Sequence, residues 1–231
     1  MEKGIGFAVM ELRDVPTLTA VNDAWPLLLE LIDQSPASAR ALPRETSRAS
    51  EALHRLQVST RSALGALAYN CGGIVLESGW LRLLGGGHDE LHSLAQANDL
   101  GEPPPDTVSP GFLVVAEDVL GGRFAIDGGA LGAEHGTVCY YGPDTLAWSS
   151  LGLGHGDFVR QMLAGAGPEF YADLRWPGWL EEVEALALDQ GISLWPPPCT
   201  VEGQDLAAAS RKAVPHAELV AFYDDFARQL G

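Results

Sequence analysis

The feature that most constrains the fold of this chain is residues 111–163, where short apolar or alternating segments are separated by glycine, proline and aspartate. Alternation with a period of two residues, bounded by turn residues, is typical of antiparallel strands joined by tight turns. The stretch after the last strand reads as a short helix, with Phe158 and Met162 on one side. We therefore predict a meander of four strands, 112–116, 123–127, 137–141 and 146–148, followed by a helix over 157–163.

Helical patterns lie before and after this meander in the sequence. The strand–helix–strand alternation that is typical of a parallel sheet is not visible. The predicted fold class is therefore α+β: an antiparallel meander sheet with helices packed on one face. The other predicted elements are helices over 24–32, 46–56, 62–69, 168–174, 177–190 and 215–230, a hairpin of strands 74–76 and 80–84, and one strand over 192–195.

The 231 residues are enough for one large domain with a sizeable core. Residues 1–20 show no clear period and are predicted to be a loosely ordered leader. Residues 21–231 are predicted to form a single α+β domain. Within it we expect a core over about 21–166 and a helical C-terminal extension over about 167–231.

The chain is strongly acidic, with 31 aspartates and glutamates against 14 lysines and arginines and a formal net charge of −17. This balance repels phosphate backbones and anionic membrane surfaces, so neither nucleic acid nor membrane is an expected partner. It suits a basic protein partner, because complementary fields speed encounter. Solubility alone also explains the acidity.

The cysteines indicate the compartment. Cys71, Cys139 and Cys199 are an odd number without CxxC spacing, which argues against a disulfide framework or a structural zinc site and fits a reducing environment. No apolar run approaches the roughly 20 residues that a membrane helix needs. A cytoplasmic location is therefore predicted.

Two motifs resemble ligand sites, and both have a plainer interpretation. His88 and His92 are four residues apart and are weak candidates for metal ligands, but three glycines precede them, and two exposed loop histidines are the preferred interpretation. The glycines of 152–156 fit a tight strand-to-helix turn better than a dinucleotide site. Cys71 is predicted to be a packed core residue. We predict no metal and no cofactor.

Acidic residues lie at the expected strand ends and turns. Aspartates in such places usually bond their own backbone. Paired carboxylates can also perform acid–base chemistry, so a small hydrolase using Asp118 and Asp127 with His88 or His155 stays open as an alternative. Six tryptophans are present, and any that is exposed is a candidate interface anchor.

Several segments together resemble the bacterial domain of unknown function 2625. The resemblance runs from about Asp23 to the end of the chain and implies no known activity. The segments that carry it are Asp23–Pro26, Leu56–Ala66, Gly72–Val75, Gly79–Gly85, Gly111–Ala116, Gly121–Gly122, Gly128–Gly132, Tyr140–Trp148 and Ser210–Pro215.

A weaker resemblance, at the level of the fold, is to the SUKH superfamily of Syd-like and yeast cell-wall-assembly-regulator-like proteins. It implies a mainly non-enzymatic binding protein, and bacterial members are often immunity proteins that neutralise nuclease or other toxins. The chain departs from this pattern in its length and in the extension after Pro168. The matching positions are Asn70–Gly73, Trp80, Gly121–Gly122, Phe124, Ile126, Val138, Tyr140, Tyr141 and Phe158.

Taken together, the sequence favours a non-enzymatic protein-binding module, one form of which is an immunity-type protein that neutralises a basic toxin domain. A small hydrolase and a homo-oligomeric structural protein, for example a homodimer, are the alternatives. The residues assigned to partner binding are Arg61, Trp80, Asp118, Asp127, Tyr141 and Asp144.

Overall fold

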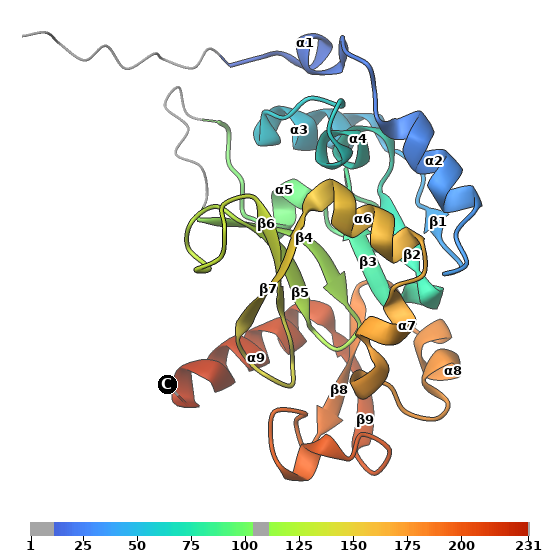
Figure 1. The fold of residues 1–231 in the computed structure, drawn as a ribbon, viewed down its shortest axis with the longest axis vertical. Coiled ribbons are helices and arrows are strands. Elements are labelled where there is room, and N and C mark those ends of the chain that lie inside the picture. Colours follow the sequence, from blue (N-terminus) through green and yellow to red (C-terminus); the bar gives the residue numbers. More distant parts are fainter. Residues whose placement is uncertain (1–11, 104–110, 231) are drawn as a thin grey trace, which may run out of the picture.

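The computed structural model describes residues 12–103 and 111–230. At its centre lies a seven-stranded antiparallel sheet in which each strand pairs with its neighbours along the chain (Figure 1). The α+β class is thus confirmed, and the predicted hairpin and meander join through β3 and β4 into one sheet. The strands are β1 (Arg40–Ala41), β2 (Gly73–Leu76), β3 (Leu81–Leu84), β4 (Phe112–Asp118), β5 (Arg123–Asp127), β6 (Thr137–Tyr141) and β7 (Trp148–Gly154).

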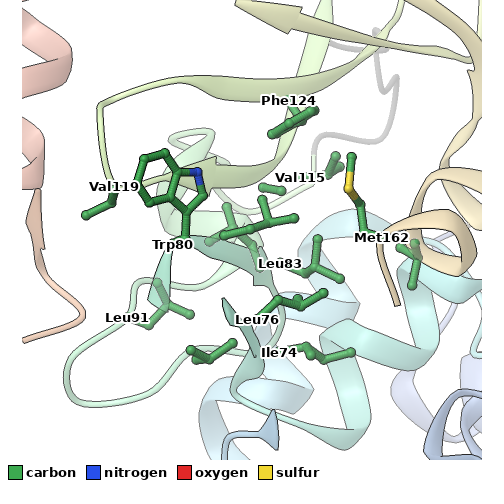
Figure 2. Packing of buried hydrophobic residues seen from close by; sticks show 14 of the residues in the cluster. Ile74, Leu76, Trp80, Leu83, Leu91, Val115, Val119, Phe124 and Met162 are labelled. Carbon is green, nitrogen blue, oxygen red and sulfur yellow. The ribbon is translucent and has the colours of Figure 1, made fainter. Parts of the chain in front are cut away.

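One face of this sheet is apolar and is covered by helices. Residues directly opposite each other on antiparallel neighbours point to the same face, and the register aligns Leu83, Ala116 and Phe124 in one such row. Phe124 packs against Phe158 with ring centroids 4.7 Å apart, and Met162 lies beside the same cluster in Figure 2. The helices on this side are α2 (Trp25–Asp33), α3 (Thr46–Leu56), α4 (Ala63–Asn70) and α6 (His155–Leu163).

The opposite face carries a row of mostly polar residues and is covered by a different helix. Here the register aligns Arg82, Glu117, Arg123 and Tyr141 across β3 to β6. Tyr223 of α9 (His216–Leu230) forms a small buried cluster with Tyr141. The C-terminal helix therefore covers the side of the sheet opposite to α6 (Figure 1).

The C-terminal part of the chain packs on the sheet domain through aromatic rings. The fully buried Trp80 contacts Tyr171, Trp176 and Trp179 at centroid distances of 5.5, 5.8 and 5.0 Å. Such ring contacts stabilise beyond the area that they bury. The elements of this part are α7 (Gly167–Phe170), η2 (Ala172–Leu174), α8 (Trp179–Glu184), β8 (Gln190–Trp195), η3 (Glu202–Gln204) and β9 (Ser210–Pro215).

Two features of this part differ from the predicted helices. The helix expected over 177–190 ends at Glu184, and the carbonyl of Leu188 instead accepts a hydrogen bond of 2.8 Å from Nη1 of the buried Arg82. The predicted strand over 192–195 belongs to β8, which pairs with β9 in a two-stranded sheet. The stretch predicted as a helical extension thus contains a hairpin. The sequence did not predict it, because β9 is too polar to show the alternating pattern of a strand.

The remaining short helices lie at the edges of the domain. Helix α1 (Val15–Thr19) falls within the stretch predicted as a leader. Its Leu18 is fully buried, and the Leu18 carbonyl accepts a hydrogen bond from the Thr60 amide. Residues 1–11 of that stretch lie outside the described part. The others are η1 (Glu77–Gly79) and α5 (Leu94–Ala97). No helix in the described ranges is long and apolar enough to cross a membrane.

Candidate functional site

The residues predicted to bind a partner do not form one exposed surface. Trp80, Asp118, Asp127 and Tyr141 are buried, each at most 6% exposed. Arg61 is exposed between α3 and α4, and Asp144 is exposed in the turn between β6 and β7. The structure therefore leaves two of the six side chains accessible to a partner.

The two buried aspartates bond the backbone of their own turns. Asp118 accepts hydrogen bonds from the amides of Leu120 and Gly122, both 2.9 Å, and from the Tyr140 hydroxyl at 2.8 Å. Burial raises the pKa of Asp118, although these bonds oppose the shift. Asp127 accepts from the amides of Gly129, Leu131 and Ala133. Both carboxylates are thus engaged in shaping turns.

His155, the histidine of the hydrolase alternative, and Cys71, predicted to be a packed core residue, both have a pKa that burial shifts. Burial lowers the pKa of His155 to about 4, and its Nδ1 has no hydrogen-bond partner among the described residues. Burial raises the pKa of Cys71 to about 12, which leaves its thiol protonated and unreactive. Over the described part of the chain, no three His, Cys, Asp or Glu residues are arranged to hold a metal ion.

A different polar group stands out at the end of β4, in a cavity of about 510 Å³. We call it the histidine–glutamate cavity. The loop that follows β3, the strand β4, the turn before β8 and the first residues of α9 meet there. The residues that line the cavity are Arg48, His88, Asp89, Glu90, Leu91, His92, Gln96, Glu117, Leu188, Asp189, Pro215, His216 and Ala217.

Glu117 is the centre of this cavity. Its Oε2 lies 3.1 Å from Nε2 of His92 and 3.4 Å from Nδ1 of His216. The side chains of Glu117 and His216 are only 8% and 5% exposed. Nε2 of His216 is 2.9 Å from the Asp118 carbonyl, which only accepts, so this nitrogen carries the proton. The His216 ring is therefore fixed with its Nδ1 toward Glu117.

The surroundings set the charge of each group. Burial raises the pKa of Glu117, but His216, His92 and Arg82 outweigh it and lower this pKa to about 2. Burial lowers the pKa of His216 more than the charge of Glu117 raises it. Burial also lowers the pKa of His92, but Glu117 reverses the shift and raises it. At neutral pH the carboxylate is ionised and the His216 ring is neutral.

Among the residues that line this cavity, the sequence suggests only His88 and His92 as possible ligands. Glu117 directly follows the apolar run 112–116, and its position could have suggested a paired carboxylate, because an unpaired glutamate is rarely buried. His216 follows Pro215 at the start of a predicted helix, and nothing local connects it to Glu117. The pairing arises because α9 begins beside the end of β4 (Figure 1).

A second surface is apolar and lies on the C-terminal hairpin and α9. Trp195 is 66% exposed and Val201 is 82% exposed. Phe222, 38% exposed, stacks on Phe226 with ring centroids 5.7 Å apart. Trp195 and Phe226 line a groove of about 240 Å³ together with Pro196, Pro197, Thr200 and Glu202. We call Trp195, Val201, Phe222 and Phe226 the C-terminal apolar surface.

The fold and these two surfaces define an α+β protein with a polar cavity open to solvent and a separate exposed apolar face. The chain belongs to a family described as "Protein of unknown function DUF2625", whose model matches residues 16–219. That range includes Glu117 and His216. The family resemblance is thereby confirmed, and the resemblance to the SUKH superfamily is not.

Two relatives show how far the similarity extends. The "Putative uncharacterized protein YbfG" of Escherichia coli (strain K12) is 34% identical over 214 residues, which are 90% of this chain and 94% of that protein. An "Uncharacterized protein" of Haemophilus influenzae (strain ATCC 51907 / DSM 11121 / KW20 / Rd) is 34% identical over 166 residues, 71% of this chain and 73% of that protein. No solved structure matches the chain.

Proposed function

We propose that this protein is a cytoplasmic protein-binding module whose partner docks on the C-terminal apolar surface. The supporting observation is the exposure of Trp195, 66%, beside Val201, 82%. Large apolar side chains gathered on a surface mark interaction sites, and tryptophan is among the residues that are enriched at their centres. The groove beside Trp195 gives a partner side chain a place to insert.

The charge of the chain favours a basic partner. The formal net charge is −17, and Glu202 lines the groove itself. A basic partner would be steered toward the molecule by this field and then held by apolar contacts. A basic toxin domain is the most specific version, and it would make this protein an immunity-type inhibitor.

Photo-crosslinking from inside the surface tests the proposal. A photoreactive phenylalanine analogue replaces Trp195 in one sample and Leu27 in the control. Leu27 is 61% exposed on α2, outside the C-terminal apolar surface. We expect one protein of the host to crosslink at position 195 only, and Trp195→Ala to weaken its purified complex at least about ten-fold. Equal crosslinking at both positions, or none at position 195, contradicts the proposal.

The identity of the crosslinked protein distinguishes the homo-oligomeric alternative from the immunity role. A crosslinked second copy of this chain, with a dimer mass by light scattering, would favour the homo-oligomeric alternative. A crosslinked toxin from a neighbouring gene, with growth rescued by co-expression of the intact protein and not of Trp195→Ala, would support the immunity role.

A further inference from the structure

The histidine–glutamate cavity shares no lining residue with the groove at Trp195, and the proposed function makes no use of it. Its volume of about 510 Å³ falls within the range of small-molecule sites, ~300–1,000 Å³. Leu91, Leu188 and Pro215 give it apolar walls. It is therefore a second place on the molecule where a ligand can bind.

The polar groups in the cavity have unmet hydrogen-bonding capacity. Nε2 of His92 lies 3.1 Å from Oε2 of Glu117 and is paired with that carboxylate, so the capacity that remains is on Glu117 and on His216. Nδ1 of His216 faces Oε2 of Glu117 at 3.4 Å, and in a neutral ring this nitrogen is an acceptor like the carboxylate. Two acceptors that face each other lack the hydrogen atom that would join them. A ligand nitrogen beside the pair, with two or more N–H groups, would donate one hydrogen bond to each acceptor.

The charge of the cavity favours a cation. Four carboxylates line it, against a single arginine, and Arg48 is already bound to Asp89 at 2.8 Å. The α9 helix begins in the cavity, and its dipole adds a partial positive charge of about half a unit. Together with Arg48, a protonated His92 and the guanidinium of Arg82 behind Glu117, this charge offsets most of the four carboxylates and leaves a small negative excess on the cavity wall. The buried Glu117 is the strongest attraction, because desolvation strengthens its field.

We propose that the histidine–glutamate cavity binds a primary alkylammonium group, which donates hydrogen bonds to the Glu117 carboxylate and to Nδ1 of His216. The alkyl chain would lie against Leu91, Leu188 and Pro215. A divalent metal is the other cation that carboxylate and imidazole ligands bind. The described residues offer no three-ligand arrangement for one. The ammonium could come from a free amine or from a lysine side chain of a protein.

Calorimetric titration of the full chain tests this proposal. The probes are n-butylammonium, Nα-acetyl-lysine amide, tetramethylammonium, Zn²⁺ and inorganic phosphate. We expect the first two to bind and the other three not to bind. Tighter binding of butylammonium indicates a free amine, and tighter binding of the lysine derivative indicates a protein side chain. Binding of tetramethylammonium as tight as that of butylammonium would overturn the proposal, because that cation has no N–H, and so would binding of Zn²⁺ or phosphate alone.

Variants assign the binding to the cavity. We expect Glu117→Gln to weaken butylammonium binding about ten-fold or more, as loss of a charge-assisted hydrogen bond does. Asp189→Asn, at an exposed position on the cavity wall, should weaken it less and tests the site without touching the core. The matched control is Glu134→Gln, an exposed glutamate that does not line the cavity. Unchanged affinity in both cavity variants would overturn the proposal.

Nuclear magnetic resonance of the His216 ring gives an independent readout. In the free protein we expect Nδ1 to have the shift of an unprotonated ring nitrogen and Nε2 that of a protonated one. Butylammonium should move the Nδ1 shift toward that of a hydrogen-bonded acceptor. A shift that does not respond at saturating amine would show that His216 is not part of the binding site. Because this cavity is separate from Trp195, failure here leaves the protein-binding proposal standing.

Discussion

Among single residues, Glu77 and Arg175 connect the C-terminal part of the chain to the sheet. Their side chains are 9% and 11% exposed and form an ion pair. The Arg175 guanidinium also lies 4.1 Å above the ring of Trp179 and 4.7 Å from that of Trp80. Arginine suits this position, because its flat cation stacks on rings while it binds a carboxylate.

Replacing Arg175 alone should destabilise the fold strongly. Arg175→Met keeps an apolar chain against the rings but leaves the Glu77 carboxylate buried without a cation. We expect the free energy of unfolding in urea to fall by about 3 kcal/mol. The double variant Glu77→Gln with Arg175→Met should recover part of this loss. If the double variant is no more stable than Arg175→Met, the unpaired carboxylate is not the cause.

His155 should make stability depend on pH. Burial lowers its pKa from 6.5 to about 4. The unfolded chain therefore binds a proton that the folded protein refuses between these pH values, so stability falls as the pH drops from 6.5 to 4. His155→Gln should remove about 3 kcal/mol of this fall. Urea unfolding at pH 7, 5.5 and 4 measures it, and identical pH profiles for both proteins would contradict the assignment.

Among the secondary-structure elements, α4 and α6 each contain a glycine. Close packing requires the glycine in α4, whereas the one in α6 has room for a side chain. In α4 a Cβ on Gly65 would lie 2.1 Å from the Ser59 carbonyl oxygen, so the helix approaches the preceding loop too closely for any side chain. In α6 a Cβ on Gly156 would meet nothing within 4 Å. Only the first glycine is required by the fold.

Alanine at these two positions should act in opposite directions. Gly65→Ala should lower the free energy of unfolding by about 1–3 kcal/mol, since the clash exceeds the gain in helix propensity. Gly156→Ala should raise it by about 0.5 kcal/mol, because only the propensity changes. Denaturant midpoints at constant slope measure both. Equal signs for the two variants would contradict the role of the Ser59 contact.

How much of the fold the sequence could predict depended on how local each signal was. The meander and the hairpin before it were predictable, because alternation and turn residues define each strand within a few positions. Strand β9 was not, since Ser210–Pro215 is polar and its pairing with β8 is tertiary. The candidate site shows the same limit. His92 could be suggested from its spacing, but Glu117 and His216 are joined only by the packing of α9.

Over the whole molecule, the sheet is covered on both sides by parts of the chain that lie far apart in sequence. Helices α2 to α4 and α6 cover one face, and α9 covers the other (Figure 1). The aromatic cluster around Trp80 holds the intervening segment against the sheet. The extension after Pro168 is therefore part of the domain's packing. Its placement also creates both surfaces, because β8 carries Trp195 and α9 carries His216.

The net charge of −17 should make the stability of the whole molecule depend on salt. Folding brings like charges together, and dissolved ions screen this repulsion once the Debye length falls below the molecular dimensions. Raising NaCl from about 0.05 to 0.5 M should therefore raise the free energy of unfolding by on the order of 1 kcal/mol.

Urea unfolding at both salt concentrations measures this effect, and the slope of the transition should stay constant. Several ion pairs oppose it, but some of them, such as Arg160–Asp157 and Arg228–Asp225, have both side chains exposed and contribute little in water. If salt lowered the stability instead, buried pairs such as Arg175–Glu77 and the Glu117 cluster would outweigh the repulsion. In that case repulsion among the acidic residues would not limit the stability of the fold. Selection for a basic partner would then be the better explanation for the acidic excess.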